Sequence, residues 1–509
     1  MNAEYKKRAI SGFFWHFLMM FISAPLSYLV RIIYDRNIPI VEIGLFYATL
    51  DLLGIIAVVR ELGLSNSLIH FIPKFKAQGR KGLIKAAILT TVRAQLAIGI
   101  FATILTIIFS KQIITYYLSR KTAIPSFDVA LAVIIIGAVS AVIDCLSGIS
   151  VFSVLGFQEQ KLYSFLNTIK MGSVLAVSAV MIFIFGIKNA LVPAIAYLVT
   201  PLIIFLIYSY FLFKKIFPEF FRVKAQFSRK LFLSIFRYAL PLAASSIGII
   251  ILISVDGICL TYFAGLEQVG IYKNAVVPTV NLIMYLPAAI TAVLFPMFSE
   301  LWEKRKKRVI GEGILKVVKY SLLIILPLAV FISIFPTVIL NLLWTSKNII
   351  GANALRILSF GIIFYTIFVI FSSFIRASGD SVTPMKIIYV SALLNLVGDI
   401  ILIPRLGMSG AAITTTLAFI IQAIIAGSIA SKRLQISLEW KNIFLNTLAA
   451  LISIFGIFLV KNLFENTILK LAISALTYFG SYLILITLLG ILNIKELKEF
   501  KRLVTGNMA

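Results

Sequence analysis

The chain has 509 residues, of which 61% are hydrophobic and 13% are charged, and its mean hydropathy is +1.04. Soluble domains contain roughly a quarter charged residues, so this composition excludes a soluble globular protein and indicates an integral membrane protein. The formal net charge of +27 would suggest a nucleic-acid partner in a soluble chain. Here we expect basic loops beside a membrane and no nucleic acid.

Fourteen apolar runs are long enough to cross a bilayer as helices, which takes about 20 residues for some 30 Å of hydrocarbon. The sequence has no alternating ten-residue pattern, so it predicts helices and not a barrel. In chain order the predicted spans are 12–34, 43–70, 83–109, 127–155, 165–186, 190–213, 235–263, 273–298, 314–343, 350–375, 386–403, 410–430, 442–461 and 468–491.

Basic residues gather in the loops on one side of these spans, as in the segment from Lys214 to Arg237 and the run from Lys304 to Arg308. The positive-inside rule then places both termini in the cytoplasm of a multi-pass protein of the cell membrane. The same loops could also attract anionic membrane lipids or a phosphate-bearing substrate.

The sequence repeats itself at an offset of 221 to 226 residues. Three motifs recur in chain order: Val41-Glu-Ile-Gly44-Leu-Phe46 as Glu267-Gln-Val-Gly270-Ile-Tyr272, Phe71-Ile-Pro73-Lys-Phe75 as Leu294-Phe-Pro296-Met-Phe298, and Gly186-Ile-Lys-Asn-Ala190 as Gly407-Met-Ser-Gly-Ala411. Two similar halves in a polytopic protein indicate an alternating-access transporter.

The repeat predicts an all-α protein of two pseudo-symmetric six-helix lobes followed by two extra carboxyl-terminal helices. The expected divisions are an N-lobe at 1–213, a basic cytoplasmic linker at 214–234, a C-lobe at 235–431 and the last two spans with a cytoplasmic tail at 432–509.

Short motifs support a family resemblance: Ala239-Leu-Pro241 at the start of the seventh span, Arg376-Ala-Ser-Gly-Asp-Ser-Val-Thr-Pro384, and Arg405-Leu-Gly-Met-Ser-Gly-Ala-Ala412. With twelve repeated spans plus two, the chain resembles the polysaccharide-transporter branch of the multidrug/oligosaccharidyl-lipid/polysaccharide exporter superfamily, especially Wzx-type oligosaccharide flippases. The resemblance implies a MATE-like fold that flips polyprenyl-(pyro)phosphate-linked oligosaccharide from the cytoplasmic to the outer leaflet for cell-surface glycan synthesis. Related branches are the lipid II flippases and the drug/cation antiporters.

Charged residues within spans are costly, by about 3 kcal/mol near the bilayer centre on insertion scales, so each is a functional candidate. An arginine binds phosphate bidentately and stays charged. The predicted substrate-binding residues are Arg31, Asp51, Arg60, Arg93 and Asp144. The alternative is internal pairing that braces the lobe, as between Arg31 and Asp35. Lys170, near a span end, is expected to extend to the membrane surface.

Asn395 and Asp399 lie four residues apart, on one face of a predicted helix. With Asp256 and the threonines that follow Ile413, they offer oxygen ligands for a hard cation or a carboxylate for a proton. The resemblance to lipid II flippases implies a sodium site formed by Asp256, Asn395, Asp399, Ala411 through its carbonyl, and Thr415. The alternative is hydrogen bonding between helices.

Three other functions are alternatives to the flippase. A drug/cation antiporter should favour acidic cavity residues, and a membrane glycosyltransferase or ligase usually needs a large soluble loop with carboxylates. The chain lacks a G-x-x-x-x-G-K-[ST] motif. A membrane scaffold would leave the charges within spans unexplained. We therefore expect a transporter and not an enzyme, with no cofactor other than Na⁺ or H⁺ as coupling ion, and with a glycan polymerase or ligase as partner.

Overall fold

The computed structural model describes residues 3–437, 439–460 and 467–492, and every regular element within them is a helix. Twelve helical segments in this part of the chain are long and apolar enough to cross a membrane. The predicted spans 235–263 and 273–298 correspond to two further helices, α10 (Arg229–Phe263) and α12 (Val277–Glu303). The prediction of an all-α polytopic protein with about fourteen spans is confirmed.

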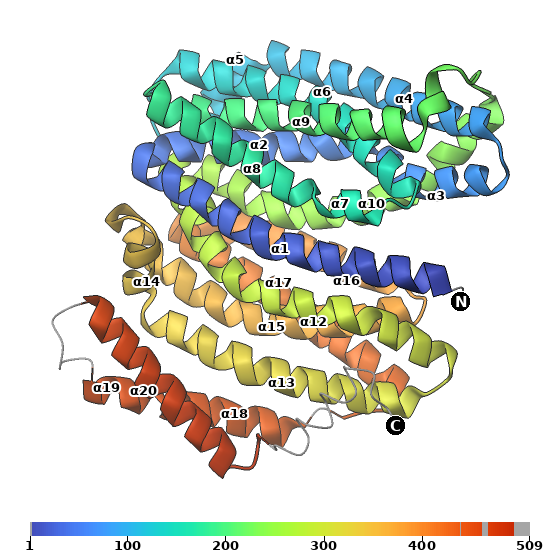
Figure 1. Cartoon of the computed structure of the whole chain (residues 1–509). Coiled ribbons are helices and arrows are strands. Elements are labelled where there is room, and N and C mark those ends of the chain that lie inside the picture. Colours follow the sequence, from blue (N-terminus) through green and yellow to red (C-terminus); the bar gives the residue numbers. More distant parts are fainter. Residues whose placement is uncertain (1–2, 438, 461–466, 493–509) are drawn as a thin grey trace. The chain divides into compact units, whose positions relative to one another are not determined.

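The chain forms two compact units, residues 1–274 and 275–509. The first unit contains α10 and the elements coloured blue to green in Figure 1. Its other elements are α1 (Ala3–Asn37), α2 (Ile40–Glu61), α3 (Leu64–Ala77), α4 (Lys81–Ile108), α5 (Ser110–Ile113), η1 (Ile114–Leu118), α6 (Phe127–Gly156), α7 (Gln160–Ser164), α8 (Leu166–Ala179), η2 (Val180–Ile184), α9 (Leu191–Phe211), η3 (Leu212–Ile216), η4 (Pro218–Phe221) and α11 (Leu266–Ile271). The π-helical turn η5 (Tyr272–Val276) follows α11 and contains the boundary between the units.

The second unit begins with α12. Its other elements are α13 (Lys307–Ile334), α14 (Pro336–Leu343), η6 (Ser346–Gly351), α15 (Ala352–Ala377), α16 (Val382–Leu406), α17 (Met408–Leu434), α18 (Trp440–Ile452), α19 (Ile454–Val460) and α20 (Thr467–Leu488). Helices α18 and α20 pack against α13, and α19 packs against α18 and α20. The Tyr482 hydroxyl donates to the Leu323 carbonyl at 2.8 Å and lies 2.6 Å from the side-chain oxygen of Asn446.

The helix bounds repeat with the same offset as the sequence. Helices α1 and α10 each have 35 residues and begin 226 residues apart, at 3 and 229. Helices α4 and α13 each have 28 residues and also begin 226 apart, at 81 and 307. The 25-residue spans Gln160–Ile184 and Val382–Leu406 begin 222 apart. The first compact unit thus includes α10 and α11 of the second repeat, while the predicted lobe divisions follow the repeat and stay a prediction.

Three predicted spans differ from the structure because the helix is divided within them, and one of these divisions is at Ser453, between α18 and α19. The span 43–70 is divided at Leu62 and Gly63, which both have positive φ, 40° and 66°, a conformation that ends a right-handed helix. The span 314–343 is divided at Phe335 because Pro336 has no N–H to continue the helix. Apolar composition alone does not show such breaks.

The first repeated motif lies where the two repeats touch. Gly44 on α2 and Gly270 on α11 occupy the same position in the two repeats, 226 residues apart. The backbones of the two helices are in close contact at these glycines. A Cβ at Gly44 would stand 1.8 Å from the Leu266 carbonyl oxygen, and a Cβ at Gly270 would stand 2.4 Å from that of Ile40. Since Ile40 and Leu266 are also equivalent, the contact is reciprocal, and small residues permit the close helix approach that membrane packing requires.

We predict that Gly44→Ala lowers the stability of the protein by about 1–3 kcal/mol or more, because two backbones must move apart to admit one methyl group. The thermal midpoint of unfolding in detergent measures the loss. The matched control is Gly172→Ala on α8, where a Cβ meets nothing within 4 Å and alanine favours the helix. Equal midpoints for the two variants would contradict the close contact.

The turn between α15 and α16 is held by one carboxylate. Asp380 accepts from the Thr383 backbone N–H at 2.9 Å and from the Thr383 hydroxyl at 2.6 Å, and it pairs with Arg433 at the end of α17. Partial burial raises the pKa of Asp380, but the hydrogen bonds from Thr383 and Arg433 outweigh it and lower the pKa to about 2. The carboxylate therefore caps α16 and ties it to α17.

Asp380→Asn should destabilise the protein by about 0.5–2 kcal/mol, the usual cost of losing a helix cap. Because the folded-state pKa is lowered, the stabilisation is complete above the ordinary value of 3.8 and is lost only as the pH falls from about 4 towards 2. Thermal midpoints of the two proteins should thus differ by a constant amount between pH 5 and 8. A difference that changes within that window would contradict the assignment.

Candidate functional site

A cavity of about 650 Å³ lies within the first unit, and we call it the N-terminal cavity. Helices α2, α3, α4, α6, α8 and α9 supply its walls, so its lining comes from one repeat. Apolar side chains form much of this lining, but four charged and several polar groups interrupt it. They are Thr49, Arg60, Glu61, Ser65, Asn66, Gln95, Ser140, Asp144, Ser147, Asn167, Lys170, Tyr197 and Thr200.

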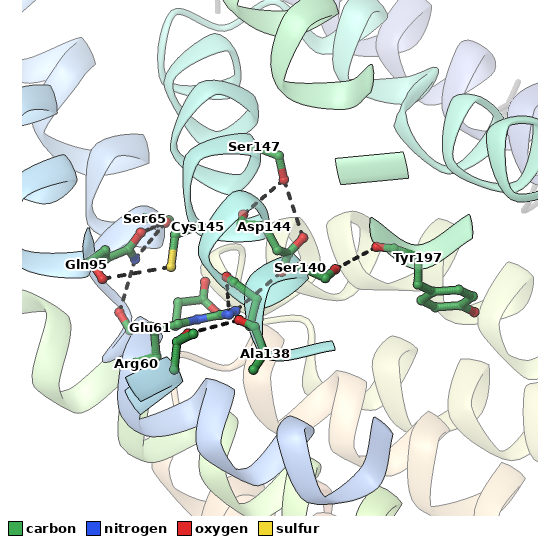
Figure 2. Close-up of polar contacts among 12 residues, drawn as sticks. Arg60, Glu61, Ser65, Gln95, Ala138, Ser140, Asp144, Cys145, Ser147 and Tyr197 are labelled. Atoms are coloured by element: carbon green, nitrogen blue, oxygen red, sulfur yellow. Dashed lines mark hydrogen bonds and ion pairs between the residues drawn. The ribbon is translucent and has the colours of Figure 1, made fainter. Parts of the chain in front are cut away.

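Arg60 connects α2 to α6 on the wall of this cavity (Figure 2). Its Nη1 donates to the carbonyl of Ala141, and its Nη2 lies 3.4 Å from Oδ2 of Asp144. The Arg60 side chain is 7% exposed, whereas that of Asp144 is 56% exposed. The cation is therefore buried in the wall and the carboxylate is open to solvent.

Two cationic groups of the cavity have spare hydrogen-bonding capacity. The buried Nε of Arg60 has no hydrogen-bond partner among the described residues. Within the same part of the chain, Lys170 on α8 makes no ion pair or hydrogen bond. The Arg60 Nε is closed off within the wall, whereas Lys170 is partly exposed and can bind an anionic ligand without breaking an existing bond.

A second polar site, the junction cluster, joins α1, α2 and α10 to η5. It consists of Arg31, Tyr47, Asp51, Asp256, Tyr272, Lys273 and Asn274. Lys273 lies at its centre, with Nζ 2.9 and 3.0 Å from the two carboxylate oxygens of Asp51 and 2.9 Å from the Ile253 carbonyl. Both side chains of this ion pair are nearly buried, at 12% and 11% exposure.

The rest of the junction cluster holds the backbone and side chains of η5. Arg31 donates to the Lys273 carbonyl at 2.8 Å and to the Tyr47 hydroxyl at 2.9 Å. Tyr272 donates to Asp256 at 3.0 Å. A π-helical turn widens the backbone and often occurs at functional sites, and here it brings three successive residues into one polar network.

The five predicted substrate-binding residues divide among three places. Arg60 and Asp144 line the N-terminal cavity, and Arg31 and Asp51 belong to the junction cluster. Arg93 reaches neither site; it is exposed on α4, with its guanidinium 4.5 Å from the Phe227 ring centroid. Their function as a single substrate site stays a prediction.

Sequence reasoning missed two lysines. Lys273 begins a predicted span and therefore resembled an ordinary flanking charge, and Lys170 was expected at the membrane surface. The structure places Lys273 in a buried ion pair and Lys170 on the cavity wall. The available signal for Lys273 was its position beside a repeated motif, three residues after Gly270.

The second unit contains a buried oxygen-rich group on α16 and α17. The Thr414 hydroxyl lies against the Asp399 carboxylate and 2.9 Å from the Ala411 carbonyl, and Asn395 donates to Thr415 at 3.5 Å. Asn395 and Asp399 are at most 1% exposed. A carboxylate, an amide, a carbonyl and hydroxyls form a donor set that suits a hard cation.

Four of the five residues predicted to form the coupling-ion site, Asn395, Asp399, Ala411 and Thr415, thus lie in the second unit. Asp256 lies in the first unit, where it accepts from Tyr272. Their combination in one site stays a prediction.

Comparison with known proteins identifies the family. The model for "Polysaccharide biosynthesis protein" matches residues 9–302, more than half of the chain, and the MatE model matches residues 241–401. An uncharacterized membrane protein of Methanocaldococcus jannaschii is 37% identical over 97% of this chain and 98% of its own length. The chain belongs to the polysaccharide biosynthesis protein family.

Solved structures share the fold. The lipid II flippase MurJ, in an inward closed conformation, matches with a TM-score of 0.71 at 18% identity, covering 93% of this chain and 99% of MurJ. An inward-facing multidrug-resistance MATE transporter matches with a TM-score of 0.64 at 17% identity, covering 82% of this chain and 98% of its own. The expected MATE-like fold is confirmed.

Proposed function

We propose that the protein is a flippase that moves a polyprenyl-(pyro)phosphate-linked oligosaccharide from the cytoplasmic to the outer leaflet. The supporting observation is a charge-lined cavity within a membrane-spanning unit of a polysaccharide biosynthesis family member. The proposal includes the cell membrane as location, cytoplasmic termini as the basic loops favour, and a glycan polymerase or ligase that uses the product.

The size and lining of the cavity suit a hydrated headgroup. A volume of about 650 Å³ is within the roughly 300–1,000 Å³ of small-molecule sites, which is enough for a phosphate with one or two sugars but not for a long lipid. The polyprenyl chain would stay in the hydrocarbon of the bilayer and would not have to enter the cavity or water. Sugar hydroxyls would find amides and hydroxyls on the wall, such as Asn66, Asn167 and Ser147.

The positive charges of the cavity, which suit a phosphate, lie on α2 and α8. Arg60 and Lys170 provide cations on α2 and α8. A guanidinium held by Ala141 and Asp144 is already oriented, so binding costs less side-chain entropy. The positive charge of Arg60 on the cavity wall would attract a phosphate oxygen.

A second candidate function is antiport of cationic compounds. The observation that favours it is the pair of carboxylates on the same wall, Glu61 and the half-exposed Asp144. The neighbouring Arg60 opposes it, because a guanidinium that stays charged repels a cationic cargo. We therefore place this function second.

We further propose that transport is coupled to Na⁺ or H⁺ through Asp256, Asn395, Asp399, Ala411 and Thr415. The support is the buried oxygen donor set on α16 and α17. A sodium ion would take the carboxylate of Asp399, the amide oxygen of Asn395 and the Ala411 carbonyl, whereas a proton would need only a carboxylate.

Arg60→Ala should reduce translocation of a labelled polyprenyl-pyrophosphate oligosaccharide in proteoliposomes by about tenfold or more, since it removes a cation whose interaction with phosphate is worth about 1.5–3 kcal/mol. The thermal midpoint must be recorded too, because Arg60 also joins α2 to α6. The matched control is Arg308→Ala, an exposed arginine paired with Glu312 on one helix. Wild-type transport by a folded Arg60→Ala protein would remove the cavity from the mechanism.

Asp399→Asn should reduce ion-driven transport to the rate measured without a gradient, because an amide lacks the negative charge that balances Na⁺ and has no oxygen that takes up a proton. Initial rates with imposed sodium and proton gradients measure this. Glu312→Gln, at an exposed carboxylate, should keep the full gradient response. An unchanged response in Asp399→Asn would leave Asp399 as an interhelical hydrogen-bonding residue.

A further inference from the structure

The ion pair between Asp51 and Lys273 connects the two repeats. Asp51 lies on α2 of the first repeat, and Lys273 lies on η5 of the second, 222 residues away in the chain. Both residues belong to the first compact unit, as do α10 and α11. The pair lies one to two turns along α2 from the reciprocal contact of Gly44 and Gly270, so the same interface carries a glycine contact and a buried ion pair.

The repeat is broken where this ion pair crosses. With the offset of 226, Arg31 is equivalent to Gly257 and Tyr47 to Lys273. In the first repeat, the Arg31 guanidinium lies 5.6 Å from the Tyr47 ring centroid. In the second, a Cβ at Gly257 would stand 1.7 Å from Oδ2 of Asp51 and 2.7 Å from Cε of Lys273. The absence of a side chain at Gly257 thus makes room for the pair.

Residues of α1 and α2 also hold the backbone around Lys273. The Lys273 carbonyl accepts a hydrogen bond from Arg31. The Asn274 side chain donates to the Arg31 carbonyl and accepts from the Tyr47 hydroxyl, both at 3.4 Å. Directly after Asn274 the first compact unit ends. The junction cluster therefore fastens the last residues of this unit to α1 and α2.

A buried ion pair is suited to repeated opening. Its Coulomb attraction is largely offset by the cost of removing both charges from water, so its net contribution is small. If α2 and α10 separate and water enters, both charges recover their hydration. Loss of only one partner is different, because the other charge then stays buried and unpaired, which favours the hydrated, open arrangement.

We propose that the ion pair of Asp51 and Lys273 is a latch that holds the two repeats together across α2, α10 and η5, and that its release opens this interface during transport. The role of the latch in transport rests on the proposed function, but the experiment that tests the latch does not require transport. Gly257 is the position that admits the latch, and the glycine contact aligns the two helices that it joins.

The test uses the solvent accessibility of one cysteine in the purified protein without any cargo. Ser254 is 5% exposed on α10, next to Ile253, whose carbonyl accepts from Lys273. Ser254→Cys is introduced with Cys145→Ala and Cys259→Ala, and its reaction rate with a charged methanethiosulfonate reagent is measured. Asp51→Asn or Lys273→Met should raise this rate by about tenfold or more, and the charge exchange Asp51→Lys with Lys273→Asp should bring it back to within about threefold.

Two controls separate latch release from unfolding. Ser178→Cys, buried beside Tyr34 within the first repeat, should stay unreactive in every variant. Lys304→Met, which removes an exposed pair with Glu300, should leave the Ser254→Cys rate unchanged. Unchanged Ser254→Cys rates in both single variants, or a charge exchange that reacts as fast as they do, would overturn the latch. Because no cargo is present, failure of the glycolipid assay would not alter this result.

Discussion

Charge within a membrane must be paired, hydrogen-bonded or hydrated, and the rest of the structure depends on this constraint. The described part of the chain meets it in three ways. Arg60 is paired with the carboxylate that faces the N-terminal cavity, Lys273 is paired with Asp51 in the junction cluster, and Asp399 is hydrogen-bonded to Thr414. Each of these interactions joins side chains from two helical elements, so each also favours the packing of those elements against each other.

The repeat supplies the framework on which these sites are built. Equal helix lengths at an offset of 226 show that both halves follow one pattern. Polar function arises where the halves differ: Arg31 has Gly257 as its equivalent, and Tyr47 has Lys273. Symmetry therefore provides two similar surfaces that fit at Gly44 and Gly270, and departures from it provide charged residues of the junction cluster.

The sequence was sufficient to predict the positions of the helices but not which helices contact each other. A run of about 20 apolar residues has few structural alternatives, and the repeated motifs predicted two related halves, which the helix bounds show again. The breaks at Gly63 and Phe335 were missed because they depend on backbone geometry. The pairing of Asp51 with Lys273 was missed because hydropathy reports the position of a span but not which face meets another helix. For the same reason Arg93 was grouped with Arg60, although it lies against Phe227.

The choice between a glycolipid flippase and a cation antiporter depends on which charge in the N-terminal cavity meets the cargo. The most direct measurement offers both cargoes to the same proteoliposomes: a labelled polyprenyl-pyrophosphate oligosaccharide and a cationic dye, with sodium and pH gradients imposed in turn. The account predicts translocation of the lipid-linked oligosaccharide and no movement of the dye. Movement of the dye alone would contradict it and assign the cavity to Glu61 and Asp144.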